Sequence, residues 1–180
     1  MSAILHQLPF HTAPDEVILG PHRIRIKPYQ IVFWVSITAR EISAPSGTAR
    51  VPVILDTGHN HNFSIQRQHL AQWAGVDETQ LDMLPEIRER GQRVTMRAAH
   101  LWIHSNLPGQ RDQFSDAAPF RLLLEGGIAI YPTDKGFPQL PLIGLRALVH
   151  NGLHFTMDPE RCVVNLRRCD WRTRLLRWLL

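Results

Sequence analysis

Short apolar runs, each followed by proline, glycine or a polar turn, restrict most strongly how this chain can fold. Residues 30–38 and 51–55 are rich in β-branched and aromatic side chains, which favour strands over helices. No apolar run approaches the roughly 18 residues that a membrane span needs. A length of 180 residues is that of a single domain. The sequence therefore predicts one mostly β domain with one or two short helices.

The first half of the chain is expected to contain an irregular segment, two paired strands and a helix. Residues 1–28 are broken by prolines and a glycine, and we expect an irregular N-terminal lead-in with one short strand at residues 22–26. The runs 30–38 and 51–55 predict neighbouring antiparallel strands. Ser64 can cap a helix over residues 65–74.

The second half is expected to contain two hairpins. After an acidic loop over residues 76–86, the pattern predicts a hairpin that turns near Gly91 and continues as a strand over residues 94–103. Within the strand pattern of residues 120–130, the Gly126-Gly127 pair permits a bulge or a close approach of two backbones. Residues 153–166 predict a C-terminal hairpin.

The net charge of +4 is concentrated at one end of the chain. Residues 161–180 contain six Arg and one Asp, so the rest of the chain is close to neutral. A nucleic-acid-binding protein usually spreads basic residues over its folded face, and we therefore expect no nucleic-acid partner. Residues 168–180 predict a basic amphipathic C-terminal helix docked on its own domain or on a dimer partner, and contact with a membrane surface is the less favoured alternative.

The start of the chain does not show the pattern of a secretory signal. Residues 1–10 have no basic segment followed by an apolar run of about 7–15 residues. The expectation is a soluble, cytoplasmic protein.

Asp56-Thr57-Gly58 directly follows the apolar run 51–55 and is the strongest indication of chemistry. A glycine lets the backbone turn sharply, and backbone amide hydrogens can then point at the carboxylate. Aspartic proteases hold their catalytic carboxylate in this way. The alternative is an ordinary strand-end turn in which the Asp side chain accepts backbone hydrogen bonds.

Two further segments resemble the retropepsin-like (retroviral-type) aspartic proteases. Val53-Ile54-Leu55 and Phe63-Ser64-Ile65 are similar to the residues around the active-site loop of that family. Leu142-Ile143-Gly144, followed by residues 145–148, resembles the family's second signature, in which two apolar residues and a glycine precede a short helix. The expected hairpin around residues 88–96 lies between the two, in the place of the family's flap.

The resemblance covers residues 29–167 and implies a retropepsin-like acid-protease half-barrel. Peptide hydrolysis by this chemistry needs two carboxylates about 3 Å apart that share one proton. Because the chain has a single Asp-Thr-Gly, the resemblance implies a homodimer in which each subunit supplies one Asp56. Asp56 would act as general acid or base, Thr57 would brace the loop across the dimer axis, and Gly58 would allow the turn.

The function implied is that of an aspartic endopeptidase, a hydrolase of peptide or protein substrates that needs no cofactor. Its groove would bind an extended peptide by strand addition. Gly91 would form the hinge or tip of the flap, and Ile103, Ile128 and Leu145 would supply apolar walls of the groove.

Two alternatives come from histidine residues. His59 takes the place of the Ala or Ser that usually follows Asp-Thr-Gly in the family, and an imidazole there changes the electrostatics of the carboxylate. A catalytically inactive, protease-like dimeric protein-interaction module is therefore the alternative function. The pairs His59/His61 and His100/His104 raise a metal-dependent enzyme as a third possibility, but we expect no metal, because the second pair lies in a β-like stretch rather than on a helix.

Overall fold

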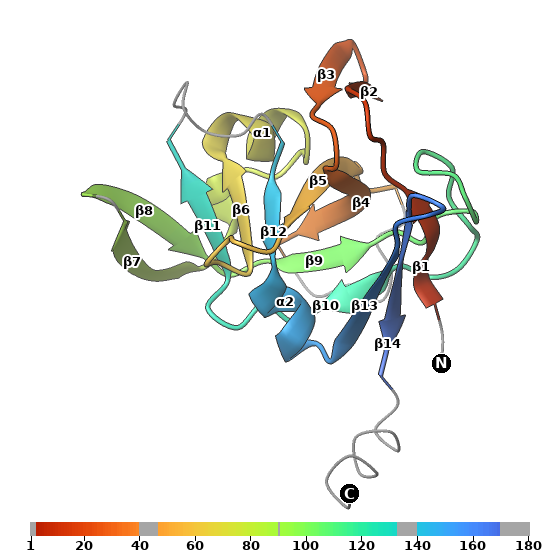
Figure 1. Cartoon of the computed structure of the whole chain (residues 1–180). Helices are drawn as coiled ribbons and strands as arrows, with labels where there is room; N and C mark the ends of the chain where they lie inside the picture. The colour runs from red at the N-terminus through yellow and green to blue at the C-terminus, as the bar shows by residue number, and fades with distance from the viewer. Residues whose placement is uncertain (1–2, 40–46, 90, 133–139, 170–180) are drawn as a thin grey trace, which may run out of the picture.

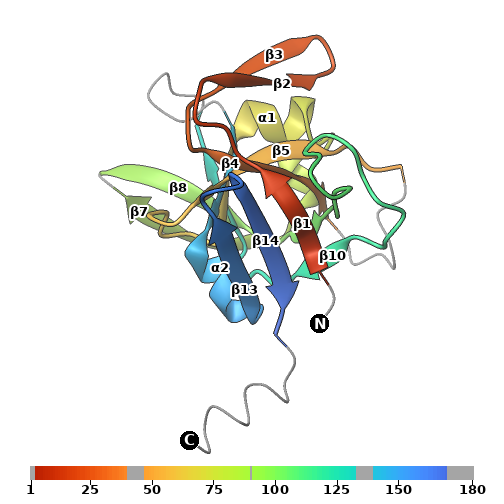
Figure 2. The ribbon, with the colours of Figure 1, turned by 45° about the vertical axis from the view of Figure 1, so that its right-hand side comes forward.

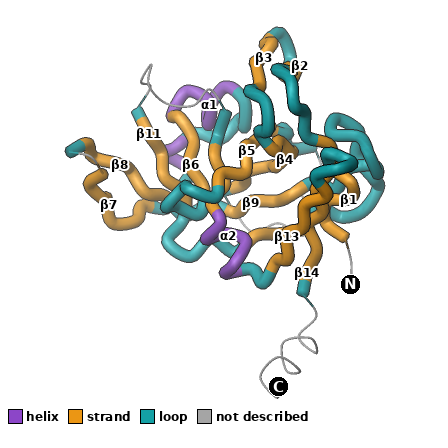
Figure 3. The backbone as a smooth tube through the Cα atoms, viewed as in Figure 1, coloured by secondary structure: helices purple, strands orange, loops and turns teal. Residues whose placement is uncertain are grey.

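The computed structural model describes residues 3–39, 47–89, 91–132 and 140–169 and is mostly β, as the sequence predicts (Figure 1). Of the helix expected over residues 168–180, only residues 168 and 169 are described, and Arg168 ends the last strand. The rest of that prediction lies outside the described residues. Figure 3 shows that the helices are short segments among many strands. In the part of the chain that the structure describes, no helix has the length and apolar character needed to cross a membrane.

A nine-stranded sheet forms the centre of the molecule, in the order β10-β9-β4-β5-β12-β6-β11-β8-β7. Its members, in chain order, are β4 (Ile31–Thr38), β5 (Val51–Asp56), β6 (Phe63–Gln66), β7 (Met83–Glu89), β8 (Gln92–Arg97), β9 (His100–Ile103), β10 (Phe120–Leu122), β11 (Ile128–Tyr131) and β12 (Leu142–Gly144). The expected antiparallel pairing of residues 30–38 with residues 51–55 is confirmed, since β4 pairs with β5 from Ile31↔Leu55 to Val35↔Val51.

Strand β12 lies between β5 and β6, although both come much earlier in the chain (Figure 1). It runs parallel to β5 and antiparallel to β6. The short helix α2 (Leu145–His150) begins immediately after β12. Because β12 separates β5 from β6, the loop that joins those two strands must pass over the end of β12.

Strand β4 is buried along its whole length, and this explains its continuous apolar sequence. Ile31, Phe33, Val35 and Ile37 belong to the main core. Val32 and Trp34 face a second core, which they share with the hairpin of β2 (Asp15–Leu19) and β3 (His22–Ile26). A strand that is buried on both faces has apolar side chains on both, so its sequence shows no alternation of apolar and polar residues.

The expectation of an irregular lead-in over residues 1–28 is wrong for most of that segment. Besides the expected strand at residues 22–26, it contains β2, which pairs with β3, and β1 (Ala3–Pro9). Strand β1 pairs with β14 (Val163–Arg168), which pairs in turn with β13 (Leu153–Asp158). Figure 2 shows β14 between β1 and β13. The prolines fall at strand ends and between strands, so they do not prevent these pairings.

Two local predictions in the middle of the chain also need correction. The helix α1 (Arg67–Gln72) is shorter than the expected 65–74, and Ser64 lies in β6 rather than at the helix cap. The expected loop over residues 76–86 contains the 3₁₀ helix η1 (Glu78–Gln80) and the first half of β7. Residues 94–103 divide between β8 and β9, which lie far apart in the sheet. The C-terminal hairpin is confirmed by the pairing of β13 with β14.

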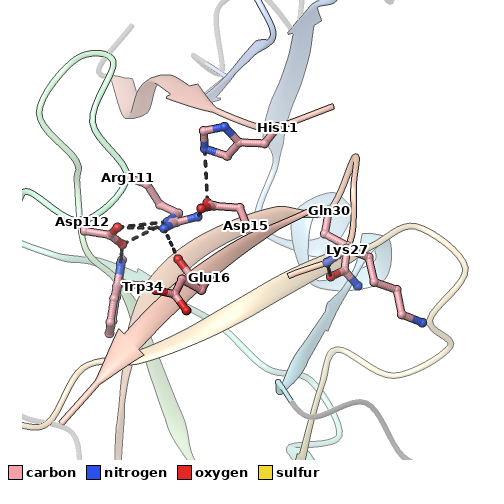
Figure 4. A network of polar contacts seen from close by, with 8 residues as sticks. All are labelled: His11, Asp15, Glu16, Lys27, Gln30, Trp34, Arg111 and Asp112. Carbon is pink, nitrogen blue, oxygen red and sulfur yellow. Dashed lines mark hydrogen bonds and ion pairs between the residues drawn. The ribbon is translucent and has the colours of Figure 1, made fainter. Parts of the chain in front are cut away.

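Arg111 fixes the β2–β3 hairpin to the body of the protein (Figure 4). Its guanidinium donates hydrogen bonds to Asp15 at 2.6 Å, to Asp112 at 2.9 Å and to the Glu16 carbonyl oxygen at 2.9 Å. Burial, the largest single effect, would raise the pKa of Asp15, but the hydrogen bonds and positive charges around it, chiefly those of Arg111, together outweigh burial and hold that pKa below its usual value. Asp112 also accepts the indole N–H of Trp34, so one arginine joins the hairpin, the 105–117 loop and β4.

Two buried histidines make the fold sensitive to acid. Burial lowers the pKa of His69, which stacks on Trp73, to about 4, with the positive charge of His22 as a second cause. Burial likewise lowers the pKa of His104 to about 4, with Arg50 as a second cause. The ring of His104 lies 2.7 Å from the Ser36 hydroxyl, which donates its own proton to the Ala49 carbonyl oxygen.

We predict that the protein loses stability as the pH falls from about 6.5 to about 4. Unfolded histidines take up protons near pH 6.5, whereas these two stay neutral in the folded state down to about pH 4. Their stabilising effect is therefore complete above pH 6.5 and declines below it. Urea unfolding at pH 7.5 and 4.5 should show a smaller pH effect in His69→Gln and in His104→Gln, by about 1–3 kcal/mol each. The exposed His154→Gln is the control, and an unchanged pH effect in all three variants would contradict the assignment.

Candidate active site

Asp56 lies at the end of a buried strand, where the chain turns into solvent. Residues Val51 to Leu55 are buried, Asp56 is partly exposed, and Thr57 and Gly58 are exposed. The Gly58 amide donates a hydrogen bond to Oδ1 of Asp56 at 2.9 Å, and the His59 amide donates to the Asp56 carbonyl oxygen at 3.2 Å. The carboxylate is thus held by its own turn, as the Asp-Thr-Gly sequence predicts.

Gly144 brings the second sequence motif next to Asp56. It is paired with Asp56 in the parallel register of β12 and β5, and its amide donates to the Asn62 carbonyl oxygen at 3.0 Å. A Cβ atom at Gly144 would collide with the His61 carbonyl oxygen and lie 2.7 Å from that of His59. The loop after Asp56 therefore rests directly on this glycine, and no larger residue fits beneath it.

Three titratable groups, Asp56, His61 and Glu89, lie close enough to His59 to influence its charge. Burial is the main cause that lowers its pKa, and the positive charge of His61 adds to this effect, while Asp56 and Glu89 act in the opposite direction. The rings of His59 and His61 are 5.4 Å apart, and Nε2 of His59 is buried without a hydrogen-bond partner. A proton on His59 is therefore less favoured than on a histidine in water.

A cluster of three polar side chains joins the loop after Asp56 to the β7–β8 hairpin. Nε2 of His61 lies 3.1 Å from Oε2 of Glu89, at the end of β7. The Tyr131 hydroxyl, at the end of β11, donates a hydrogen bond to the same carboxylate oxygen. The rings of His61 and Tyr131 are 6.3 Å apart. Sequence reasoning missed this cluster, because its members come from three separate segments and share no motif.

A pocket of about 350 Å³ opens between this loop and the hairpin. It is lined by residues of the loop, by apolar residues of the hairpin, by the turn before β11 and by the start of α2. The lining residues are Asn60, His61, Asn62, Leu84, Pro85, Ile87, Met96, Glu125, Gly126, Gly127 and Arg146. Asp56 does not line the pocket, but residues 60–62 of the loop that follows it do.

The expected close approach at Gly126-Gly127 is confirmed, and both glycines line this pocket. A Cβ atom at Gly127 would collide with the Arg97 carbonyl oxygen and lie 2.5 Å from Cδ1 of Leu84. Gly127 therefore allows the hairpin to pack tightly against the turn before β11.

The residues predicted to bind substrate do not all come together. Gly91 lies in the turn between β7 and β8 with φ of +81°, which confirms the position of the hairpin turn. Leu145 is 43% exposed at the start of α2, close to Gly144. Ile103 and Ile128 are both 0% exposed within the main core. The prediction that they line a groove is therefore wrong, because a peptide cannot reach side chains on the inner face of the sheet.

The histidine pairs do not form a metal cluster in the described part of the chain. His61 contacts Glu89, His100 lies 3.1 Å from the Arg121 guanidinium, and His104 contacts Ser36. Among residues 3–39, 47–89, 91–132 and 140–169, no three His, Cys, Asp or Glu side chains are grouped so that they could hold a metal ion.

Comparison with known proteins gives no family assignment. The chain matches no protein-family model, and a search of curated proteins finds no significant match. The function must therefore be argued from the site itself.

We predict that Gly144→Ala destabilises the protein and displaces the loop after Asp56. The added methyl group must push away the His61 and His59 carbonyl oxygens, which costs about 1–3 kcal/mol in a well-packed site. Urea unfolding measures the loss. Ala147→Gly, on the adjacent helix, tests whether a general weakening of α2 has the same effect on the loop. Hydrogen exchange at residues 57–62 should rise in Gly144→Ala only, and unchanged exchange there would contradict the packing argument.

Proposed function

We propose that this protein is a retropepsin-like aspartic endopeptidase that is active as a homodimer. The observation that carries the proposal is the pairing of Asp56 with Gly144, with the loop after Asp56 resting on that glycine. The insertion of β12 between β5 and β6 joins the two sequence motifs that resemble the family. An ordinary strand-end turn would not require a second, distant motif beneath it.

The proposed reaction uses one Asp56 from each subunit. One carboxylate takes a proton from a water molecule as the water oxygen bonds to the peptide carbonyl carbon, and the other donates its proton to the carbonyl oxygen. The tetrahedral intermediate then collapses: the C–N bond breaks, the leaving amine takes a proton from one carboxyl group, and a hydroxyl of the intermediate returns its proton to the other, so that the pair again holds one shared proton. The hydrogen bond from the Gly58 amide orients the Asp56 carboxylate for this role.

Exposed residues around Asp56 support a dimer. Thr57 is exposed beside Asp56, where a second subunit would cover it. Leu145 and Val149, one helical turn apart on α2, are 43% and 60% exposed. Apolar side chains gathered on one face of a helix commonly mark an interface, and a two-fold interface would use the same patch on both subunits.

The pocket beside the loop supports an extended peptide as substrate. Its lining includes apolar side chains of the hairpin and the polar side chains of Asn60, His61 and Asn62. Such a pocket can accept a substrate side chain while the peptide backbone lies along the strands.

Asp56→Asn should abolish cleavage of a denatured protein at a mildly acidic pH at which urea unfolding shows that the wild-type fold is retained. The neutral amide cannot exchange the proton that the reaction needs, and we expect the rate to fall at least about a hundredfold. Wild-type cleavage should also be blocked by a statine-type inhibitor. Asp116→Asn, at an exposed position away from the turn, is the control. Equal cleavage by wild type and Asp56→Asn would show that Asp56 is not the catalyst. A wild-type protein that binds the denatured substrate without cleaving it would favour the alternative of a protein-interaction module.

The dimer itself is tested by sedimentation. Replacing Leu145 and Val149 together by Asp should weaken self-association at least about tenfold, because the apolar patch would carry like charges across the two-fold axis. Ile18→Asp, at a position that is 58% exposed on the β2–β3 hairpin, serves as the control. A wild-type chain that remains a 20.7 kDa monomer at every concentration would exclude the shared carboxylate pair.

A further inference from the structure

The β7–β8 hairpin is fixed firmly at its base. Strand β8 pairs with β11 only at Thr95, Met96 and Arg97, and Gly127 packs tightly beneath Arg97. Toward the turn, the hairpin continues as a two-stranded arm in which Arg88 pairs with Arg93. Figure 1 shows this arm extending from the edge of the sheet. A two-stranded arm of this kind is marginally stable in water without further contacts.

A second attachment lies near the turn, on the side that faces the loop after Asp56. Glu89 is the last residue of β7, and its carboxylate accepts hydrogen bonds from the Tyr131 hydroxyl and from His61. The side chains of His61 and Glu89 are 14% and 31% exposed, so water screens their contact only in part. Hydrogen bonds to a charged acceptor are roughly twice as strong as those between neutral groups.

Residues of the hairpin and of the loop after Asp56 line the pocket together. Leu84, Ile87 and Met96 come from the hairpin, and His61 comes from the loop. Glu89 does not line the pocket, but it belongs to the same hairpin, so its contact with His61 ties the hairpin to the loop beside the pocket.

We propose that Glu89 is a positioning residue, which docks the β7–β8 hairpin on His61 and Tyr131 and thereby sets the width of a substrate side-chain pocket. The pocket suits an apolar side chain, because the hairpin contributes the apolar side chains of Leu84, Ile87 and Met96 to its lining. The role in substrate binding rests on the proposed function, whereas the docking of the hairpin does not. Glu89 lies in the hairpin and acts through its position, without a part in proton transfer.

Docking is tested by hydrogen exchange, which needs neither substrate nor activity. In Glu89→Gln, amides of residues 83–97 should exchange about five- to tenfold faster than in wild type, because the charged acceptor is lost. Tyr131→Phe, which removes only the hydroxyl donor, should give a smaller increase in the same residues. Glu86→Gln is the matched control, since Glu86 pairs with Arg93 across the same hairpin at 3.8 Å with both side chains largely exposed. Hairpin exchange in Glu89→Gln equal to that in wild type would overturn the proposal.

The link to substrate is tested by the kinetics of the wild-type and variant full-length proteins. Cleavage of a peptide with apolar side chains should show a KM raised about five- to tenfold in Glu89→Gln, with kcat within about twofold of wild type. Glu86→Gln should change neither constant. A large fall of kcat with an unchanged KM would place Glu89 in the chemistry instead and overturn the positioning role. Faster hairpin exchange in a protein that cleaves no peptide would support docking and count against the proposed function alone.

Discussion

The insertion of β12 between β5 and β6 is the constraint on which the rest of the site depends. It forces the loop from Asp56 to Asn62 to arch over the end of β12, and Gly144 is the point of contact. The loop therefore begins at the Asp56 turn and ends, at residues 60–62, beside the pocket. The position of the Asp56 carboxylate and the contact between His61 and the hairpin both follow from this arch.

The charged and titratable groups of the protein place opposing demands on the pH. An aspartic protease mechanism needs one shared proton on a pair of carboxylates, which favours acid. The buried histidines of this chain oppose acid, because burial lowers the pKa of His69 and of His104 to about 4. His59, next to the carboxylate turn, also resists protonation. A working enzyme of this kind would combine acid chemistry with a fold that is most stable nearer neutral pH.

Local sequence predicted the elements that are determined by short-range patterns. The β4–β5 pair, the hairpin turn at Gly91 and the C-terminal hairpin could each be found, because runs of β-branched residues, alternation and turn residues are signals that span only a few positions. Residues 1–28 were not predicted well, since β1 gains its partner β14 only when the two ends of the chain meet. The burial of Ile103 and Ile128 also escaped prediction, because an apolar residue on a strand suits a groove and a core equally well.

The sequence by itself determined a mostly β chain with one Asp-Thr-Gly turn and a second motif that ends in Gly144. Turn chemistry is local: the Gly58 amide reaches the Asp56 carboxylate across two residues. Only the tertiary structure decided that Gly144 lies beneath the loop, that Glu89 meets His61 and Tyr131, and that a pocket opens between them. These contacts join residues far apart in the chain, and their geometry follows from the order of strands in the sheet, which no local pattern specifies.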